Sequence, residues 1–161
     1  GPGSPDIAWQ TGSYIIGEDT SIWYQPEFTY HAYRYMEIEG LRKKPEKNEV
    51  YGLFMHTNVR NENNITTSSE LINSIQKAVE RTFLANLISV QSDCPAGEKF
   101  GYGGDLNATS ESFIYNFDMQ SIYRKTIYDW VDAMNDSIFV DTAPYVGIKY
   151  CGLSWESRKP K

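Results

Sequence analysis

Three carboxylates lie close together in one glycine-rich stretch in the second half of the chain. Residues 92–105 read SDCPAGEKFGYGGD and contain Asp93, Glu98 and Asp105 together with four glycines and one proline. Such glycine density is typical of tight turns and of close approach between backbone segments. The stretch lacks the Gly-Lys-Ser/Thr ending of a phosphate-binding loop, and three carboxylates would repel phosphate. The residue types favour acid–base chemistry over nucleotide binding.

Neighbouring carboxylates raise one another's pKa, and an apolar wall raises it further. Phe100 and Tyr102 would supply such a wall, and their aromatic faces suit the C–H face of a sugar ring. A carboxylic acid that stays protonated near neutral pH is what a glycosidase needs to protonate a leaving oxygen. Two other interpretations stay open. One is a surface loop with solvated acids, and the other is a divalent-metal site, although the acids lack a regular ligand spacing.

The elements expected around this loop change character near residue 66. Before that point, residues 28–39 alternate with a period of two, residues 50–59 resemble a returning strand, and Trp9–Ile16 is an earlier strand candidate. After it the period is helical, and we expect three helices. The first has about 18 residues and begins with a Thr67–Glu70 capping box, the second spans about 105–116, and Asp118 caps the third. Strands followed by helices predict an α+β chain.

Each predicted helix has one apolar stripe, which we expect to be buried. The stripe residues of the three helices in turn are Leu71, Ile75, Ala78, Val79 and Phe83; Leu106, Thr109, Phe113, Ile114 and Phe117; and Ile122, Tyr123, Ile127, Trp130, Val131 and Met134.

Length and composition exclude several classes of protein. The chain has 161 residues, a formal net charge of −6 and 14% aromatic residues. It is too hydrophobic and aromatic to be disordered, it lacks the apolar run of a transmembrane helix, and its acidity argues against nucleic-acid binding. Cys94, Cys151, His31 and His56 match no zinc pattern, and we expect no metal and no cofactor. We interpret residues 1–4 as a cloning scar, so localisation stays open, with an extracellular or periplasmic place favoured over the cytoplasm.

The order of several motifs resembles that of a known family. Asp93-Cys94-Pro95, Glu98, Gly101 and Gly104-Asp105 resemble the signature loop of the α-L-rhamnosidases of glycoside hydrolase family 78. Residues 26–35 (PEFTYHAYRY) resemble the segment just before that family's catalytic domain, and residues 140–144 (VDTAP) resemble a later loop. The resemblance covers roughly residues 25–156, and the signature loop is its most specific part.

The resemblance implies an antiparallel β-sandwich portion over residues 5–66, followed over residues 67–161 by the first helices of an (α/α)6 toroid. The family removes terminal α-L-rhamnose with inversion of configuration, without a cofactor. Glu98 stands at the position of the general acid. Asp93, Asp105 and Tyr102 would bind the rhamnose-containing glycoside.

Departures from the family pattern leave the activity of this chain uncertain. The family's general base is a Glu late in the toroid, and we assign it to no acid of this chain, so we expect the isolated chain to be inactive. Gly97 stands where the family commonly has Arg, and Tyr102 stands where Trp is usual. The alternative is a non-catalytic sugar-binding or interaction fragment. Unpaired helix faces predict self-association, and we expect neither a nucleic-acid nor a membrane partner.

Overall fold

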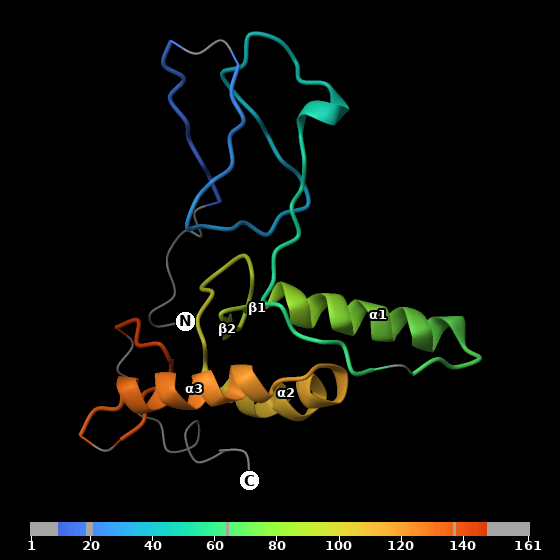
Figure 1. Cartoon of the computed structure of the whole chain (residues 1–161), viewed down its shortest axis with the longest axis vertical. Helices are drawn as coiled ribbons and strands as arrows, with labels where there is room; N and C mark the ends of the chain where they lie inside the picture. Colours follow the sequence, from blue (N-terminus) through green and yellow to red (C-terminus); the bar gives the residue numbers. More distant parts are fainter. Residues whose placement is uncertain (1–9, 19–20, 64, 137, 148–161) are drawn as a thin grey trace.

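A computed structural model of the chain describes residues 10–18, 21–63, 65–136 and 138–147. These ranges hold three α-helices, α1 (Glu70–Ala85), α2 (Gly103–Asn116) and α3 (Gln120–Ala133). They also hold the 3-10 helix η1 (Lys47–Glu49) and an antiparallel pair of short strands, β1 (Leu87–Ile88) and β2 (Val90–Gln91). Figure 1 shows the helices together at one end, while the N-terminal segment, residues 10–18 and 21–59, extends from them mostly as long loops. Residues 1–4, Trp9 and Cys151 lie outside the described residues.

Helix α1 confirms the first predicted helix, but it begins after the predicted capping box. Ser69 is its N-cap, and its side-chain Oγ accepts a hydrogen bond from the Ile72 amide at 3.4 Å. Thr67 bonds instead to Asn73: both its amide, at 2.9 Å, and its hydroxyl, at 3.0 Å, donate to Asn73 Oδ1. The predicted Thr67–Glu70 box is therefore wrong, because the Asn73 carboxamide holds Thr67 outside the helix.

The core lies where α1, α2 and the strand pair meet. Leu87, Phe113, Phe117 and Met119 are buried, and the ring of Phe83 on α1 stacks on Phe113 with centroids 4.0 Å apart. The predicted inward positions of Phe113 and Phe117 are confirmed. These contacts attach α2 to the strands that precede the acidic loop, so the loop begins and ends on packed elements.

The inward face of α2 differs from the prediction at one position. Ile114 is 56% exposed, whereas Asn116 is buried. Asn116 Oδ1 accepts hydrogen bonds from Gln76 Nε2 at 2.5 Å and from Asn63 Nδ2 at 2.9 Å. Because α1 meets this face through a polar pair as well as through Phe113, the buried stripe is rotated away from Ile114.

Helix α3 follows the predicted range but is only half-buried. The Tyr123 hydroxyl donates to Ser110 O on α2 at 3.2 Å, which holds the two helices side by side. Ile127 and Val131, predicted to face inward, are exposed, as are Leu71 and Ile75 on α1. Self-association through these apolar faces stays a prediction. Within the described residues, no helix is long and apolar enough to cross a membrane.

The β-sandwich portion expected over residues 5–66 is not confirmed. The described residues of this range contain no strand, and one isolated bridge joins Asn61 to Phe117. Phe28 has a φ of 57°, which breaks the extended backbone at the start of the predicted strand over 28–39. The alternation in the sequence indicates which side chains share a face. A strand also requires a neighbour whose N–H and C=O groups pair with its own, and alternation does not supply that neighbour.

Candidate active site

The loop that carries Asp93 and Glu98 runs from Ser92 to Tyr102, between β2 and α2, and Asp105 follows in α2. At its start the Ser92 amide donates to Asn86 O at 2.8 Å, beside the fully buried Leu87. At its end the Gly103 amide donates to Asp141 O at 3.0 Å. Both ends of this acidic loop are therefore held by backbone hydrogen bonds to other parts of the fold.

Asp93 closes the acidic loop on itself. Its amide donates to Phe100 O at 3.0 Å, and its Oδ1 accepts from the Phe100 amide at 2.9 Å. The Cys94 thiol donates to the other oxygen, Oδ2, at 2.9 Å. Each carboxylate oxygen has two lone pairs, so Asp93 can hold the loop and still accept hydrogen bonds from a ligand.

Residues 140–144 form one wall of the acidic loop. The Ala143 amide donates to Gly101 O at 3.0 Å, and Tyr102 forms an antiparallel bridge with Thr142. A Cβ at Gly101 would lie only 2.4 Å from Ala143 O, so this approach requires glycine. The sequence singled out both segments as motifs, and the structure places them in contact.

Tyr102 contacts Glu98 directly. The Tyr102 hydroxyl donates to Glu98 Oε2 at 2.5 Å. Burial raises the pKa of Tyr102, and the hydrogen bond to Glu98 and the carboxylate charges raise it further. The phenol therefore stays protonated and acts as a donor that orients the Glu98 carboxyl group. The sequence placed Tyr102 at the substrate, whereas its contact in this structure is with the predicted acid.

Asp105 lies in the first turn of α2, near the other two acids. Burial raises the pKa of its carboxyl group, and the charge of Asp93 and then that of Glu98 raise it further. Neighbouring negative charges raise the pKa of a carboxyl group in this way, because they disfavour its ionised form. Hydrogen bonding and charge interactions thus connect four side chains in one cluster, Asp93, Glu98, Tyr102 and Asp105.

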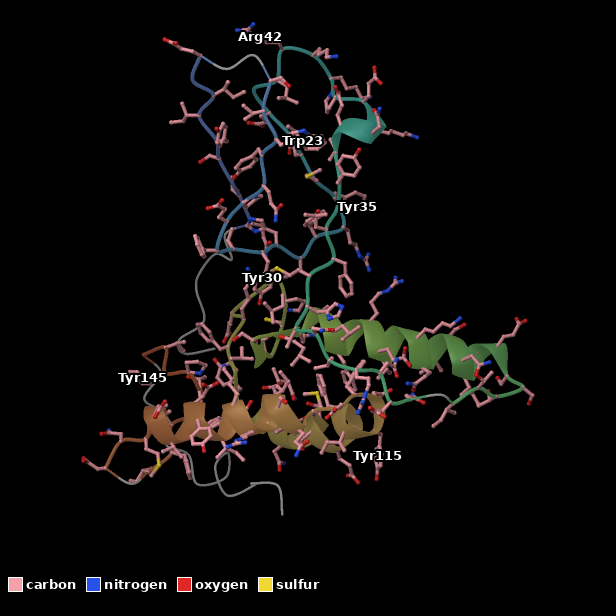
Figure 2. The ribbon with its side chains drawn as sticks, in the orientation of Figure 1. Trp23, Tyr30, Tyr35, Arg42, Tyr115 and Tyr145 are labelled. Atoms are coloured by element: carbon pink, nitrogen blue, oxygen red, sulfur yellow. The ribbon has the colours of Figure 1, made fainter. Side chains whose placement is uncertain are left out.

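Sequence reasoning missed the pair that joins this cluster to the N-terminal segment. Lys99 Nζ donates to Tyr30 O at 2.6 Å and lies 4.3 Å from the centroid of the Tyr30 ring. Lys99 has a φ of 61°, in the left-handed region of the backbone. Tyr30 lies where the N-terminal segment meets the helical end of the molecule (Figure 2). Tyr30 belongs to the PEFTYHAYRY motif, but nothing along the chain indicates its partner.

A second link reaches the turn of the acidic loop. Gln10 Nε2 donates to Ala96 O at 2.5 Å, and Gln10 Oε1 is 3.1 Å from His31 Nδ1. His31 therefore makes a structural hydrogen bond, and its neighbour Tyr30 makes the other link to the loop. The N-terminal segment contacts the loop on both sides of Glu98 in sequence.

The arrangement is suited to proton donation toward a polyhydroxylated ligand. It combines a carboxyl group held by a phenol with two further carboxylates that accept hydrogen bonds from hydroxyls. In the described part of the chain, no group of three or more His, Cys, Asp or Glu side chains could hold a metal ion.

Two family models match successive parts of the chain. Residues 60–159 match the bacterial alpha-L-rhamnosidase 6 hairpin glycosidase domain. Residues 6–56 match the bacterial alpha-L-rhamnosidase concanavalin-like domain.

Curated relatives carry the same name. An alpha-L-rhamnosidase of Streptomyces avermitilis is 33% identical over 142 residues, which are 85% of this chain and 14% of that protein. An alpha-L-rhamnosidase of Formosa agariphila is 31% identical over 120 residues, 74% of this chain and 13% of that protein. The chain thus spans only 13–14% of the length of these relatives.

Solved structures are similar as well. The alpha-L-rhamnosidase from Dictyoglumus thermophilum is 35% identical with a TM-score of 0.60, over 64% of this chain and 12% of that one. The S. avermitilis alpha-L-rhamnosidase complexed with L-rhamnose is 29% identical with a TM-score of 0.55, over 57% of this chain and 9% of that one.

Proposed function

Because this chain belongs to the bacterial α-L-rhamnosidase family with a six-hairpin glycosidase domain, we propose that it forms the acid side of an inverting rhamnosidase site, with Glu98 as the general acid. The reaction is hydrolysis of a terminal α-L-rhamnoside. One observation carries the proposal: Tyr102 donates to Glu98 at 2.5 Å, in a cluster that includes Asp105. The pKa of Asp105 is raised by burial and then by the charges of Asp93 and Glu98.

Glu98 has to deliver a proton to the oxygen that links rhamnose to the leaving group. The hydrogen bond from Tyr102 limits the rotation of the Glu98 carboxyl group, so the proton is presented in one direction. Negative charge on neighbouring carboxylates favours the protonated form of an acid beside them. The same charges stabilise the oxocarbenium-like transition state of glycoside hydrolysis.

Asp93 and Asp105 are the proposed acceptors for the rhamnose hydroxyls. The acidic loop holds Asp93 through Phe100 and Cys94, and α2 holds Asp105 in its first turn. Groups fixed in this way lose little conformational freedom when a sugar binds.

Inversion also requires a base that activates water at about 6.5–9.5 Å from the acid. We assign this role to no acid of the present chain. The expected behaviour of the 161-residue chain is therefore rhamnose binding without turnover. This behaviour is also that of the alternative function, a sugar-binding fragment, so the role of Glu98 needs a test of its own.

Calorimetric titration with L-rhamnose tests the binding part of the proposal. Asp105→Asn should weaken binding by about 10-fold or more, because a hydrogen bond to a charged group contributes ~1.5–3 kcal/mol. Glu111→Gln is the control, because Glu111 is another acid of α2 that is exposed and accepts a hydrogen bond from Tyr115 at 3.0 Å. The proposal would be refuted if the wild type did not bind L-rhamnose, or if Asp105→Asn bound L-rhamnose as tightly as the wild type does.

The pH dependence of binding to methyl α-L-rhamnoside tests Glu98. A protonated Glu98 donates to the glycosidic oxygen, so the wild-type affinity should fall as Glu98 ionises. Glu98→Gln keeps a hydrogen-bond donor at every pH. The affinity of this variant should therefore not show the decrease with pH that is due to Glu98. Equal pH profiles in the two proteins would exclude Glu98 as the acid. Turnover of an aryl α-L-rhamnoside by the chain alone would instead contradict our inference that no acid of this chain acts as the base.

A further inference from the structure

The N-terminal segment contains an open cavity of about 570 Å³ that the proposed function does not use. This volume lies within the ~300–1,000 Å³ usual for small-molecule sites. Its wall combines aromatic rings with groups that form hydrogen bonds, among them Tyr14, Trp23, Tyr24, Glu27, Thr29 and His31.

The aromatic part of the wall is exposed, and each of its rings lies close to another ring. Trp23 is 84% exposed, and its ring centroid lies 5.8 Å from that of Tyr51. The ring centroids of Tyr14 and Tyr24 are 5.0 Å apart. In Figure 2 Trp23 lies among the loops of the N-terminal segment, away from the helices. Aromatic rings that are open to solvent suit the apolar C–H face of a sugar.

The polar part of the wall suits hydroxyl groups. The Glu27 carboxylate accepts hydrogen bonds, and the Thr29 hydroxyl can donate or accept. In a neutral His31 ring, one nitrogen donates and the other accepts. Within the described residues, His31 Nε2 is buried without a hydrogen-bond partner, while Nδ1 contacts Gln10. A buried polar atom without a partner costs about 1–3 kcal/mol, which a ligand hydroxyl would offset.

Hydrogen bonds place this cavity next to the acidic loop. His31 lines the cavity and contacts Gln10, and Gln10 donates to Ala96 O at 2.5 Å. Ala96 precedes Glu98 by two residues, and Lys99 on the other side of Glu98 bonds to Tyr30, the neighbour of His31. Hydrogen bonds through Gln10 and Lys99 therefore link the His31 side of the cavity to the loop that carries the proposed acid.

From this arrangement we propose that the cavity is the subsite for the leaving-group sugar, the saccharide to which the rhamnose is attached. The proposal rests on the proposed function, because a general acid protonates the oxygen between the two sugars and the leaving group must then lie on the acid's side. Its ligand class is a neutral pyranose that stacks on Trp23 or Tyr24 and bonds to Glu27 and His31.

Calorimetry with three probes tests the subsite in the 161-residue chain: methyl α-L-rhamnoside, a disaccharide of α-L-rhamnose linked to glucose, and glucose. The wild type should bind the disaccharide about 10-fold more tightly than the methyl rhamnoside. Trp23→Ala should remove most of this difference and leave the affinity for methyl rhamnoside unchanged. Tyr35→Ala is the matched control, since Tyr35 is an aromatic residue of the same segment, 90% exposed, that does not line the cavity.

The outcomes separate this proposal from the proposed function. Equal wild-type affinities for the disaccharide and the methyl rhamnoside would overturn the subsite, and so would a difference that persists in both Trp23→Ala and Glu27→Gln. Glu27→Gln retains the size of the side chain, so it tests the cavity even if Trp23→Ala does not fold. Binding of glucose that Trp23→Ala abolishes would support the subsite even if rhamnose binding did not respond to Asp105→Asn.

Discussion

Gly101→Ala is the sharpest test of how the acidic loop is held. The new methyl carbon would lie 2.4 Å from Ala143 O, 3.5 Å from Ala143 C and 3.7 Å from Val90 Cβ. Carbon–oxygen contacts of this kind begin near ~3.3 Å, so the backbone would have to separate by roughly 0.9 Å. The neighbour is backbone, which cannot rotate away as a side chain can.

The cost of Gly101→Ala follows from what that separation breaks. The Ala143 amide bonds to Gly101 O and the Gly103 amide bonds to Asp141 O, both at 3.0 Å. Overpacking costs about 1–3 kcal/mol, and weakening two backbone hydrogen bonds adds about 1 kcal/mol. We expect the free energy of unfolding to fall by about 3 kcal/mol. For a chain of this size, the corresponding decrease in Tm is roughly 6–12 °C.

Thermal unfolding followed by far-ultraviolet circular dichroism measures this decrease, and two other glycines calibrate it. A Cβ at Gly17 meets nothing within 4 Å, so Gly17→Ala should change the stability by less than about 0.5 kcal/mol. A Cβ at Gly103 would lie 3.0 Å from the Trp130 ring, which can move, so Gly103→Ala should fall between the two. If Gly101→Ala and Gly17→Ala unfold at the same temperature, residues 101–103 do not pack against residues 141–143 as described.

Two further predictions concern the helix face and the acid cluster. Phe113→Ala should lower the free energy of unfolding by about 3–5 kcal/mol, because Phe113 is buried against Phe83. Ile114 is exposed, so Ile114→Ala should lower it by much less. Equal losses of stability in chemical denaturation would contradict the orientation of α2. Because the pKa of Asp105 is raised in the folded chain, the folded state retains this proton more tightly than the unfolded state. The free energy of unfolding should therefore fall as pH rises from 3.8 through the raised pKa of Asp105. Asp105→Asn should lack this fall in stability. Parallel pH profiles of the two proteins would contradict a raised pKa of Asp105 in the folded chain.

Local patterns predicted the parts of this molecule that depend on neighbours along the chain. The helical period after residue 66 predicted α1, α2 and α3, and Phe113 and Phe117 face the core as expected. The dense glycines around three acids predicted a tight loop between helices, and the carboxylates lie close enough to perturb Asp105. The cap of α1 was misplaced because Asn73 binds Thr67, a choice between two local partners that spacing alone does not decide.

The other predictions that were not confirmed involve partners far apart in sequence. The alternation of residues 28–39 indicates a two-sided segment, but its pairing depends on another segment that alternation does not identify. Ile114 has the residue type of a core position, and only the packing of Gln76 and Asn63 on Asn116 turns it outward.

By itself, the sequence determined the family, the helices and the residues of the acidic loop, since residue types, spacing and periodicity are properties of short stretches of chain. The tertiary structure decided which distant segments shape that loop: residues 141–143 against Gly101, Tyr30 against Lys99, and Gln10 with His31 against Ala96. The physical reason is that such contacts depend on the complementary shape and hydrogen bonding of surfaces that come together only on folding.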